Sequence, residues 1–155
     1  MTLVATPSAL DPSLYISELK PKRRDSVLAE MVELAHRAGS VRDPAPLLEL
    51  LLCRERLGTT AIGKGVAIPN ARSLVVVRPQ IVFARSRRGI EWNAPDAQPV
   101  SLVLLVLAPA EWSEMTSHSF LGRAVAVARL QRNRQRLLEA ASFEAAAQVL
   151  KEISA

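Results

Sequence analysis

The stretch from Val100 to Leu107 is the strongest constraint on the fold of this chain, because it is almost continuously apolar. Only Ser101 interrupts it, and Pro109 follows shortly after its end. The run is far too short to cross a bilayer, which takes about 20 apolar residues in a helix. A strand of this length without polar alternation is typical of one buried on both faces. The sequence therefore predicts a central strand covered on both sides and no membrane insertion.

Helical patterns lie on both sides of this strand along the chain. A first helix is predicted to begin at a cap from Asp25 or Ser26 and to end at Gly39. A second helix is predicted to begin at Asp43–Pro44, where proline suits the first turn. The last third of the chain is helical, and Ser142 is expected to cap the final helix.

Two further runs of β-branched residues, Val75–Val77 and Ile81–Ala84, predict additional strands. Strands that lie between helical regions indicate an α/β protein. With 155 residues we expect a single α/β domain. Residues 1–13 are small, polar and proline-containing, so we expect a loose N-terminal arm there and the domain over 14–155.

The charge of the chain leaves more than one class of partner open. Lys and Arg number 20 and Asp and Glu number 15, giving a net charge of +5, which permits an acidic partner or nucleic acid. Four arginines lie close together with no acid before Glu139, namely Arg129, Arg132, Arg134 and Arg136. They form either a solvated helix surface or a binding patch. Only 4% of residues are aromatic and none interleave with basic residues, which disfavours nucleic acid.

The motifs disfavour several kinds of catalytic site. The single cysteine, Cys53, and the two histidines do not stand at metal-ligand spacing, so no metal site is expected. There is no nucleophile elbow, and Lys64 is not in the frame of a phosphate-binding P-loop. We therefore expect no cofactor. One cysteine and the lack of a basic-then-apolar leader favour a cytoplasmic location.

The most informative segment runs from Arg54 to Asn70 and reads RERLGTTAIGKGVAIPN. Two glycines flank Lys64, and Pro69 precedes Asn70, a combination that sets up special backbone geometry. The segment resembles the string REKLGSTGIG-GIAIPH of type-2 IIA domains in the bacterial phosphotransferase system. That family includes fructose, mannitol and nitrogen-regulatory members.

Three later segments are similar to further parts of the same family's pattern, in the same order. They are GIEWNAPDAQPVSLVLLVLAP at 89–109, SHSFLGRAVAVARL at 117–130 and LLEAASFEAAAQVL at 137–150. The resemblance covers about residues 14 to 153. It implies the fold of a type-2 IIA domain, a single-domain three-layer sandwich with a central mixed β-sheet flanked by helices.

The resemblance also implies what the site residues do. In that family a histidine after Ala-Ile-Pro accepts a phosphoryl group from the carrier HPr, and here that position is Asn70. An amide nitrogen delocalises its lone pair into the carbonyl and is a poor nucleophile. Arg54 would neutralise charge, and His118 would orient the phosphoryl group. The remaining candidates for a phosphate pocket are Thr59, Thr60, Gly63, Lys64 and Gly65. We expect Asn70, Arg54 and His118 to converge around one shallow pocket.

Three functions remain in view at this point. The first is a regulatory IIA-like protein that carries no phosphate at the usual site and binds other proteins, such as a transporter, a kinase or another component of the phosphotransferase system. The second is a working phosphocarrier that uses His118 or another acceptor. The third is a binder of nucleic acid or of an acidic partner through the Arg129–Arg136 patch. The sequence leaves the partner's identity and the oligomeric state open.

Overall fold

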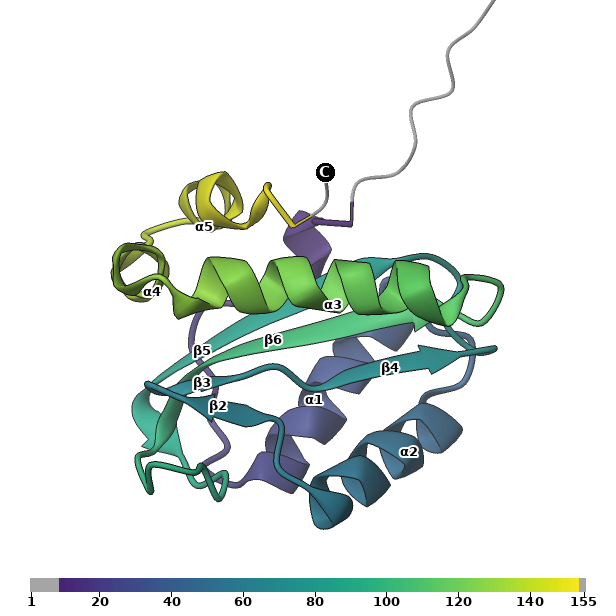
Figure 1. Cartoon of the computed structure of the whole chain (residues 1–155), viewed down its shortest axis with the longest axis horizontal. Helices are drawn as coiled ribbons and strands as arrows, with labels where there is room; N and C mark the ends of the chain where they lie inside the picture. The colour runs from purple at the N-terminus through teal and green to yellow at the C-terminus, as the bar shows by residue number, and fades with distance from the viewer. Residues whose placement is uncertain (1–8, 154–155) are drawn as a thin grey trace, which may run out of the picture.

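The computed structural model describes residues 9–153, and in it one mixed sheet of six strands runs through the middle of the domain (Figure 1). The strands are β1 (Tyr15–Ile16), β2 (Ala61–Gly63), β3 (Val66–Ala67), β4 (Asn70–Ser73), β5 (Gln80–Ile90) and β6 (Val100–Pro109). β6 is central. It pairs antiparallel with β5 on one side and parallel with both β3 and β4 on the other, while β1 and β2 lie outermost. The predicted mixed sheet is confirmed.

β6 is buried on both faces, as its apolar sequence predicted. Val103 and Leu105 belong to one hydrophobic core, and Leu102 and Leu104 belong to another. Alternate side chains of a strand point to opposite faces, so this strand separates the two cores. Each core therefore depends on the helices that cover its face.

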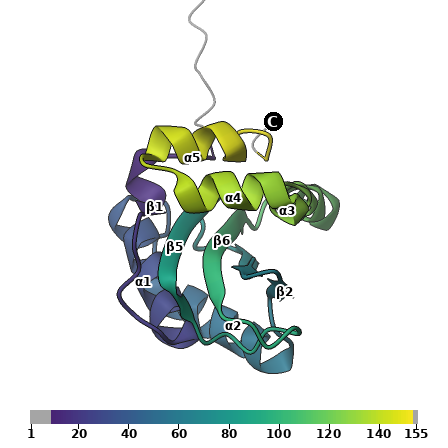
Figure 2. The same cartoon turned by 90° about the vertical axis from the view of Figure 1, so that its left-hand side faces the viewer.

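The helices form one layer on each side of the sheet (Figures 1 and 2). They are the short 3-10 helix η1 (Pro12–Leu14), then α1 (Arg24–Arg37), α2 (Pro44–Leu57), α3 (Glu114–Arg129), α4 (Gln131–Glu139) and α5 (Phe143–Leu150). α1 and α2 supply the first core, and α3, α4 and α5 supply the second. Within residues 9–153 no helix has the length and apolar character needed to span a bilayer.

Two of the predicted helix starts are confirmed and one is wrong. The Asp43 carboxylate accepts a hydrogen bond from the Ala45 N–H at 3.3 Å with Pro44 in the first turn, and Ser142 Oγ accepts from the Ala145 N–H at 3.2 Å. α1 instead begins at Arg24 without a side-chain cap, one residue before the expected Asp25. Its end is as expected, because Gly39 takes a φ of +81° just beyond the last turn.

The strands differ from the sequence prediction in three places. Val75–Val77 is not a strand, and Val76 forms only an isolated bridge with Val41. β5 runs well past the predicted Ile81–Ala84, because antiparallel pairing with β6 continues to Ile90 across a register shift. β4 was not expected, since Asn70–Ser73 has no run of β-branched residues. Its parallel hydrogen bonds to β6 override that weak local preference.

The expected loose arm over 1–13 falls partly outside the described residues, which begin at Ala9. Ala9 is buried, and its carbonyl accepts a hydrogen bond from the Ile81 N–H at 3.0 Å. The Asp11 carboxylate accepts hydrogen bonds from the Ser13 hydroxyl at 2.7 Å and from the Ser13 N–H at 2.8 Å, and the second bond caps η1. These two bonds lower the pKa of Asp11. Residues 9–13 are thus packed onto the domain, because their backbone groups find partners on β5 and in η1.

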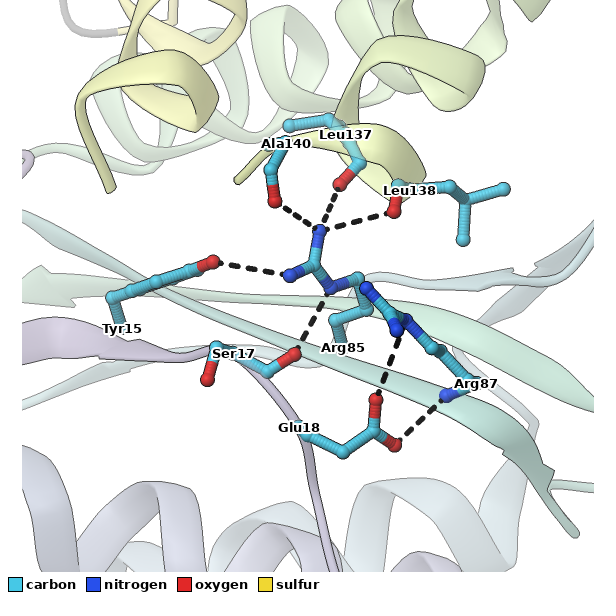
Figure 3. A network of polar contacts seen from close by, with 8 residues as sticks. All are labelled: Tyr15, Ser17, Glu18, Arg85, Arg87, Leu137, Leu138 and Ala140. Atoms are coloured by element: carbon cyan, nitrogen blue, oxygen red, sulfur yellow. Dashed lines mark hydrogen bonds and ion pairs between the residues drawn. The ribbon is translucent and has the colours of Figure 1, made fainter. Parts of the chain in front are cut away.

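A buried guanidinium on β5 connects the sheet to the segment after β1 and to the end of α4 (Figure 3). Arg85 is only 4% exposed. One of its nitrogens donates to the carbonyls of Leu137, Leu138 and Ala140 at 2.8 to 3.1 Å. Its Nε donates to the Ser17 carbonyl at 2.9 Å. The last carbonyls of a helix lack partners in their own helix and carry partial negative charge, so Arg85 both bonds and neutralises the end of α4.

The assignment of β6 as a buried strand makes a direct prediction for Leu104→Asp. Leu104 has no exposed surface, so the variant buries an unpaired carboxylate and loses several kcal/mol of unfolding free energy in urea titrations. Leu74→Asp is the matched control, because Leu74 is 82% exposed. Equal unfolding midpoints for the two variants would contradict the strand assignment.

The Arg85 contacts predict that Arg85→Met destabilises the domain by leaving buried carbonyls of α4 without donors. Each such group costs about 1–3 kcal/mol, and hydrogen exchange should speed up first in α4 and α5. Arg88→Met removes an exposed arginine of the same strand and should leave both quantities unchanged. If exchange in α4 is the same in the two variants, Arg85 does not hold that helix.

Candidate functional site

A small pocket of about 120 Å³ opens where α2, β4, β6 and the start of α3 meet. It is lined by Arg54, Asn70, Ala71, Arg72, Val106, Ala108, Glu114, Ser117, His118 and Leu121. The expectation that Arg54, Asn70 and His118 lie around one pocket is confirmed. These residues come from three separate elements, so the fold brings together side chains that are far apart in the sequence.

Asn70 occupies its place because a parallel strand restarts there. The Pro69 carbonyl accepts a hydrogen bond from the Val106 N–H at 2.9 Å, and Asn70 then pairs in register with Val106. The side chain of Asn70 is bonded at both ends. Its Nδ2 donates to the Ile68 carbonyl at 3.0 Å, and its Oδ1 accepts from a guanidinium nitrogen of Arg54 at 3.4 Å. The amide is thereby oriented with its oxygen toward Arg54.

Arg54 stands in the last turn of α2, and its neighbour Glu55 fastens that turn to the body of the domain. Glu55 is 4% exposed. Its carboxylate accepts hydrogen bonds from the Thr60 N–H at 3.1 Å, from Trp92 Nε1 at 3.2 Å and from the Thr60 hydroxyl. The helix end that carries Arg54 is therefore held to the following loop and to a buried indole.

The sequence interpretation missed Glu55, although a signal for it exists. Glu55 falls four residues after Leu51 and eight after Leu47, and both leucines are buried. Positions with this spacing share one face of a helix, so the stripe itself points to a buried carboxylate. Trp92 is buried as well, and its Nε1 donates to the Glu55 carboxylate.

The first turns of α3 supply two residues of the pocket, His118 and Ser117. The sequence interpretation missed Ser117. The Ser113 hydroxyl accepts from the Thr116 N–H at 3.1 Å and caps the helix, which aims the first turns at the pocket. His118 is exposed at the pocket wall. The Ser117 hydroxyl oxygen is buried there and has no hydrogen-bond partner within residues 9–153. Nothing in the sequence around Ser117 indicated that its hydroxyl would be buried.

Arg72 is a second cation of the pocket that the sequence did not reveal, because β4 itself was not predicted. Asn70 and Arg72 are two residues apart on one strand, so they share a face. A guanidinium nitrogen of Arg72 donates to the Trp112 carbonyl at 2.8 Å, and another lies 3.8 Å from the Glu114 carboxylate. Arg72 therefore fixes the segment between β6 and α3 against β4.

The other predicted pocket residues are not brought to this pocket. Thr60 bonds Glu55, and the Thr59 hydroxyl accepts from the Ala61 N–H at 3.1 Å. The remaining three, Gly63, Lys64 and Gly65, form the turn between β2 and β3 with φ angles of +87°, +59° and +78°. The sequence analysis placed these residues at the phosphate site because they belong to the same continuous motif as Asn70. The strands β2 and β3, however, place the turn away from β4.

The β2–β3 turn is held by the long loop before β6. The Lys64 N–H donates to the Asp96 carboxylate at 2.9 Å. This bond, with a second from the Gln98 N–H, holds the pKa of Asp96 below its usual value. The Gly65 carbonyl also accepts a hydrogen bond from the Ser101 N–H at 2.8 Å. The turn that contains the glycines is therefore bonded to β6.

Within residues 9–153 no group of three or more His, Cys, Asp or Glu side chains is placed to hold a metal ion. The pocket is instead small and polar: besides one carboxylate, Glu114, which lies beside Arg72, it has two arginines, an imidazole, an amide and a hydroxyl without a partner among the described residues. Such groups can bind an oxyanion through charge and hydrogen bonds. Arginine forks suit the oxygens of phosphate in particular.

Comparison with known families identifies this architecture. A family model described as "Phosphoenolpyruvate-dependent sugar phosphotransferase system, EIIA 2" matches residues 8–153. The chain belongs to this family. A crystal structure of the nitrogen regulatory protein IIA-Ntr from Neisseria meningitidis has the same type-2 EIIA fold, with a TM-score of 0.83 at 29% identity over 92% of this chain and 96% of that one. The predicted family and fold are confirmed.

Two curated relatives show how the length of this type-2 EIIA chain compares with the length of other proteins. The fructose-specific EIIA component of Haloferax volcanii is 34% identical over 148 residues, which cover 94% of this chain and 95% of that protein. The fructose-specific EIIABC component of Bacillus subtilis is 33% identical over 134 residues. The chain covers only 21% of the length of that second relative.

The buried carboxylate that supports Arg54 makes a prediction for Glu55→Gln. An amide has one acceptor oxygen and presents an N–H₂ group to donors, so at least one of the Thr60 and Trp92 hydrogen bonds is lost. We expect a loss of about 1–3 kcal/mol in unfolding free energy. Glu49→Gln, an exposed position of the same helix, is the control and should leave stability unchanged. Equal stability of both variants would contradict the anchoring role of Glu55.

Proposed function

We propose that this chain is a IIA protein of the nitrogen-regulatory type that carries no phosphoryl group at its pocket and acts by binding other proteins. One observation carries the proposal: the side chain of Asn70 lies in the pocket between Arg54 and the Ile68 carbonyl. The motif resemblance assigns Asn70 to the position of the family's acceptor histidine. The chain would thus retain the pocket without its nucleophile.

The chemistry of the amide supports this reading. A neutral imidazole attacks phosphorus with an in-plane lone pair, but the nitrogen of an amide acts only as a hydrogen-bond donor. In this pocket Asn70 Nδ2 already donates to the Ile68 carbonyl. A phosphoryl group delivered from the phosphohistidine of HPr would have no nitrogen to bond to at Asn70.

The groups around Asn70 support a pocket that stays in its unphosphorylated form. Arg54 is exposed and has no carboxylate partner within residues 9–153, and its bond to the neutral oxygen of Asn70 is long at 3.4 Å. Such a bond is weak, so the guanidinium keeps most of its capacity for an anion. The pocket would resemble the unphosphorylated form of a IIA protein at all times, and would present a constant surface to partners.

Exposed apolar side chains near the pocket favour a protein as the partner. Leu74 directly follows β4 and Met115 lies in the first turn of α3, and each is 82% exposed. Apolar anchors beside polar groups are the usual make-up of a protein interface. A transporter, a kinase or another component of the phosphotransferase system fits this role, and we propose the cytoplasm as the place of action.

The proposal predicts that a single substitution restores phosphoryl acceptance. The chain is incubated with phosphoenolpyruvate, the first enzyme of the phosphotransferase system and HPr, and acid-labile phosphate is measured. The wild type should acquire none. Asn70→His should become labelled, slowly, because Arg54 remains in place and both this chain and HPr are basic. Adding Arg54→Gln to that variant should slow labelling about a hundredfold.

Asn70→Gln is the matched control, because it keeps the amide and should stay unlabelled. Labelling of the wild type that persists in Asn70→Ala and disappears in His118→Ala would contradict the proposal. That result would favour the alternative of a phosphocarrier with a relocated acceptor. Failure of Asn70→His to become labelled at any salt concentration would show that the pocket lacks more than its nucleophile.

A further inference from the structure

A second hollow, here called the α3–α4 hollow, lies at the other end of α3 from the pocket. It is lined by Ile62, Gly63, Lys64, Ala128, Arg129 and Arg134, and its volume is about 290 Å³. Its lining residues come from the β2–β3 turn and from the junction of α3 with α4. Both segments lie on the left side of the domain in Figure 1. His118 and Arg129 are 11 residues apart on α3, which is about 16 Å at 1.5 Å per residue. The hollow is therefore separate from the Asn70 pocket.

Hydrogen bonds hold the main chain of Lys64 and the side chain of Arg134 in place. Lys64 has a positive φ between two glycines, and its N–H is bonded to Asp96. One guanidinium nitrogen of Arg134 donates to the carbonyls of Ala128 at 3.1 Å and Arg129 at 2.6 Å. These carbonyls end α3, so Arg134 offsets the negative end of that helix. The Lys64 amine and the other nitrogens of Arg134 have no protein acceptor within residues 9–153.

Three cations line the hollow, and one carboxylate, that of Asp96, lies next to them. No carboxylate lines it, and none of Lys64, Arg129 and Arg134 forms an ion pair within the described part of the chain. Asp96 belongs to the loop before β6, where its carboxylate bonds main-chain N–H groups, and it is not part of the lining. Like charges held together repel, and a bound anion would relieve that repulsion.

Helix geometry divides the arginine patch that the sequence showed. Arg129 and Arg134 line the α3–α4 hollow, whereas Arg132 and Arg136 line another shallow surface with Gln131 and Gln135. Residues four apart share a helix face, which accounts for the pairing of Arg132 with Arg136. Substitutions in one pair of arginines can therefore serve as controls for substitutions in the other pair.

We propose that the α3–α4 hollow binds a small oxyanion with two or more negative charges, carried by phosphate or carboxylate groups. The volume lies near the lower end of small-molecule sites, which span about 300–1,000 Å³. Guanidinium forks and an ammonium group bind the oxygens of both anion types. The half-exposed Ile62 and buried Ala128 give the ligand an apolar wall. The ligand would bridge the β2–β3 turn to the start of α4 and does not depend on Asn70.

The test is a nuclear magnetic resonance titration of the full ¹⁵N-labelled chain with sodium pyrophosphate and, separately, with sodium citrate at constant ionic strength. At least one probe should give saturable shifts at the amides of residues 63–65 and 128–129. The signals of Asn70 and His118 should not move in step with them. Saturation by pyrophosphate alone assigns phosphate chemistry to the ligand, and saturation by citrate alone assigns carboxylate chemistry.

Matched variants decide whether these residues form the site. Lys64→Gln and Arg129→Gln should each weaken binding about tenfold, since each removes a charge-assisted hydrogen bond. Lys64→Gln keeps the main-chain bond to Asp96, and unchanged spectra elsewhere confirm that the fold is intact. Arg132→Gln and Arg136→Gln remove the same charge outside the hollow and should leave affinity within about twofold.

Three results would overturn the proposal. The first is the lack of a saturable response to either probe. The second is an equal loss of affinity in Arg132→Gln and Arg129→Gln, which would mean diffuse attraction to a basic surface. The third is tight binding of a single-stranded oligonucleotide that requires Arg132 and Arg136 as much as Arg129, which would assign the surface to nucleic acid.

Discussion

The parallel pairing of β4 with β6 is the constraint on which the geometry of the pocket depends. Register places Asn70 opposite Val106 and Arg72 opposite Ala108, so the side chains of Asn70 and Arg72 face the same pocket. β6 can hold this position because it is buried on both faces and is bonded on both edges. The break at residues 68–69 allows β4 to begin just where Pro69 bonds β6. The side chains of α2 and α3 then complete the pocket.

Two buried charges secure the helices on opposite faces of this sheet, and neither forms an ion pair within residues 9–153. Glu55 accepts hydrogen bonds from an N–H, a hydroxyl and an indole, and Arg85 donates to backbone carbonyls and the Tyr15 hydroxyl. A buried charge is costly unless its hydrogen-bonding capacity is met, so these contacts tolerate little change. Glu55 bears directly on the site because it follows Arg54, whereas Arg85 fixes α4, whose Arg134 lines the α3–α4 hollow.

The sequence could predict those parts of the fold that local chemistry decides. A nearly continuous apolar run predicted β6, and side-chain caps predicted the starts of α2 and α5. Likeness to a family predicted that Arg54, Asn70 and His118 would meet. β4 escaped prediction because its strand conformation comes from pairing with a distant strand rather than from its own residues. Arg72 and Ser117 escaped for the same reason, since only tertiary contacts place them at the pocket. The roles assigned to these site residues stay predictions.

The most direct test of the central claim is the ¹⁵N–¹H spectrum of the wild-type chain before and after reaction with phosphoenolpyruvate, the first enzyme and HPr. If the Asn70 pocket holds one state, the side-chain signals of Arg54 and Asn70 and the amide of His118 should keep their positions after the carriers are removed. A second set of signals at these residues, in slow exchange with the first and lost on mild acid treatment, would show that the pocket carries a phosphoryl group and would contradict the proposed function.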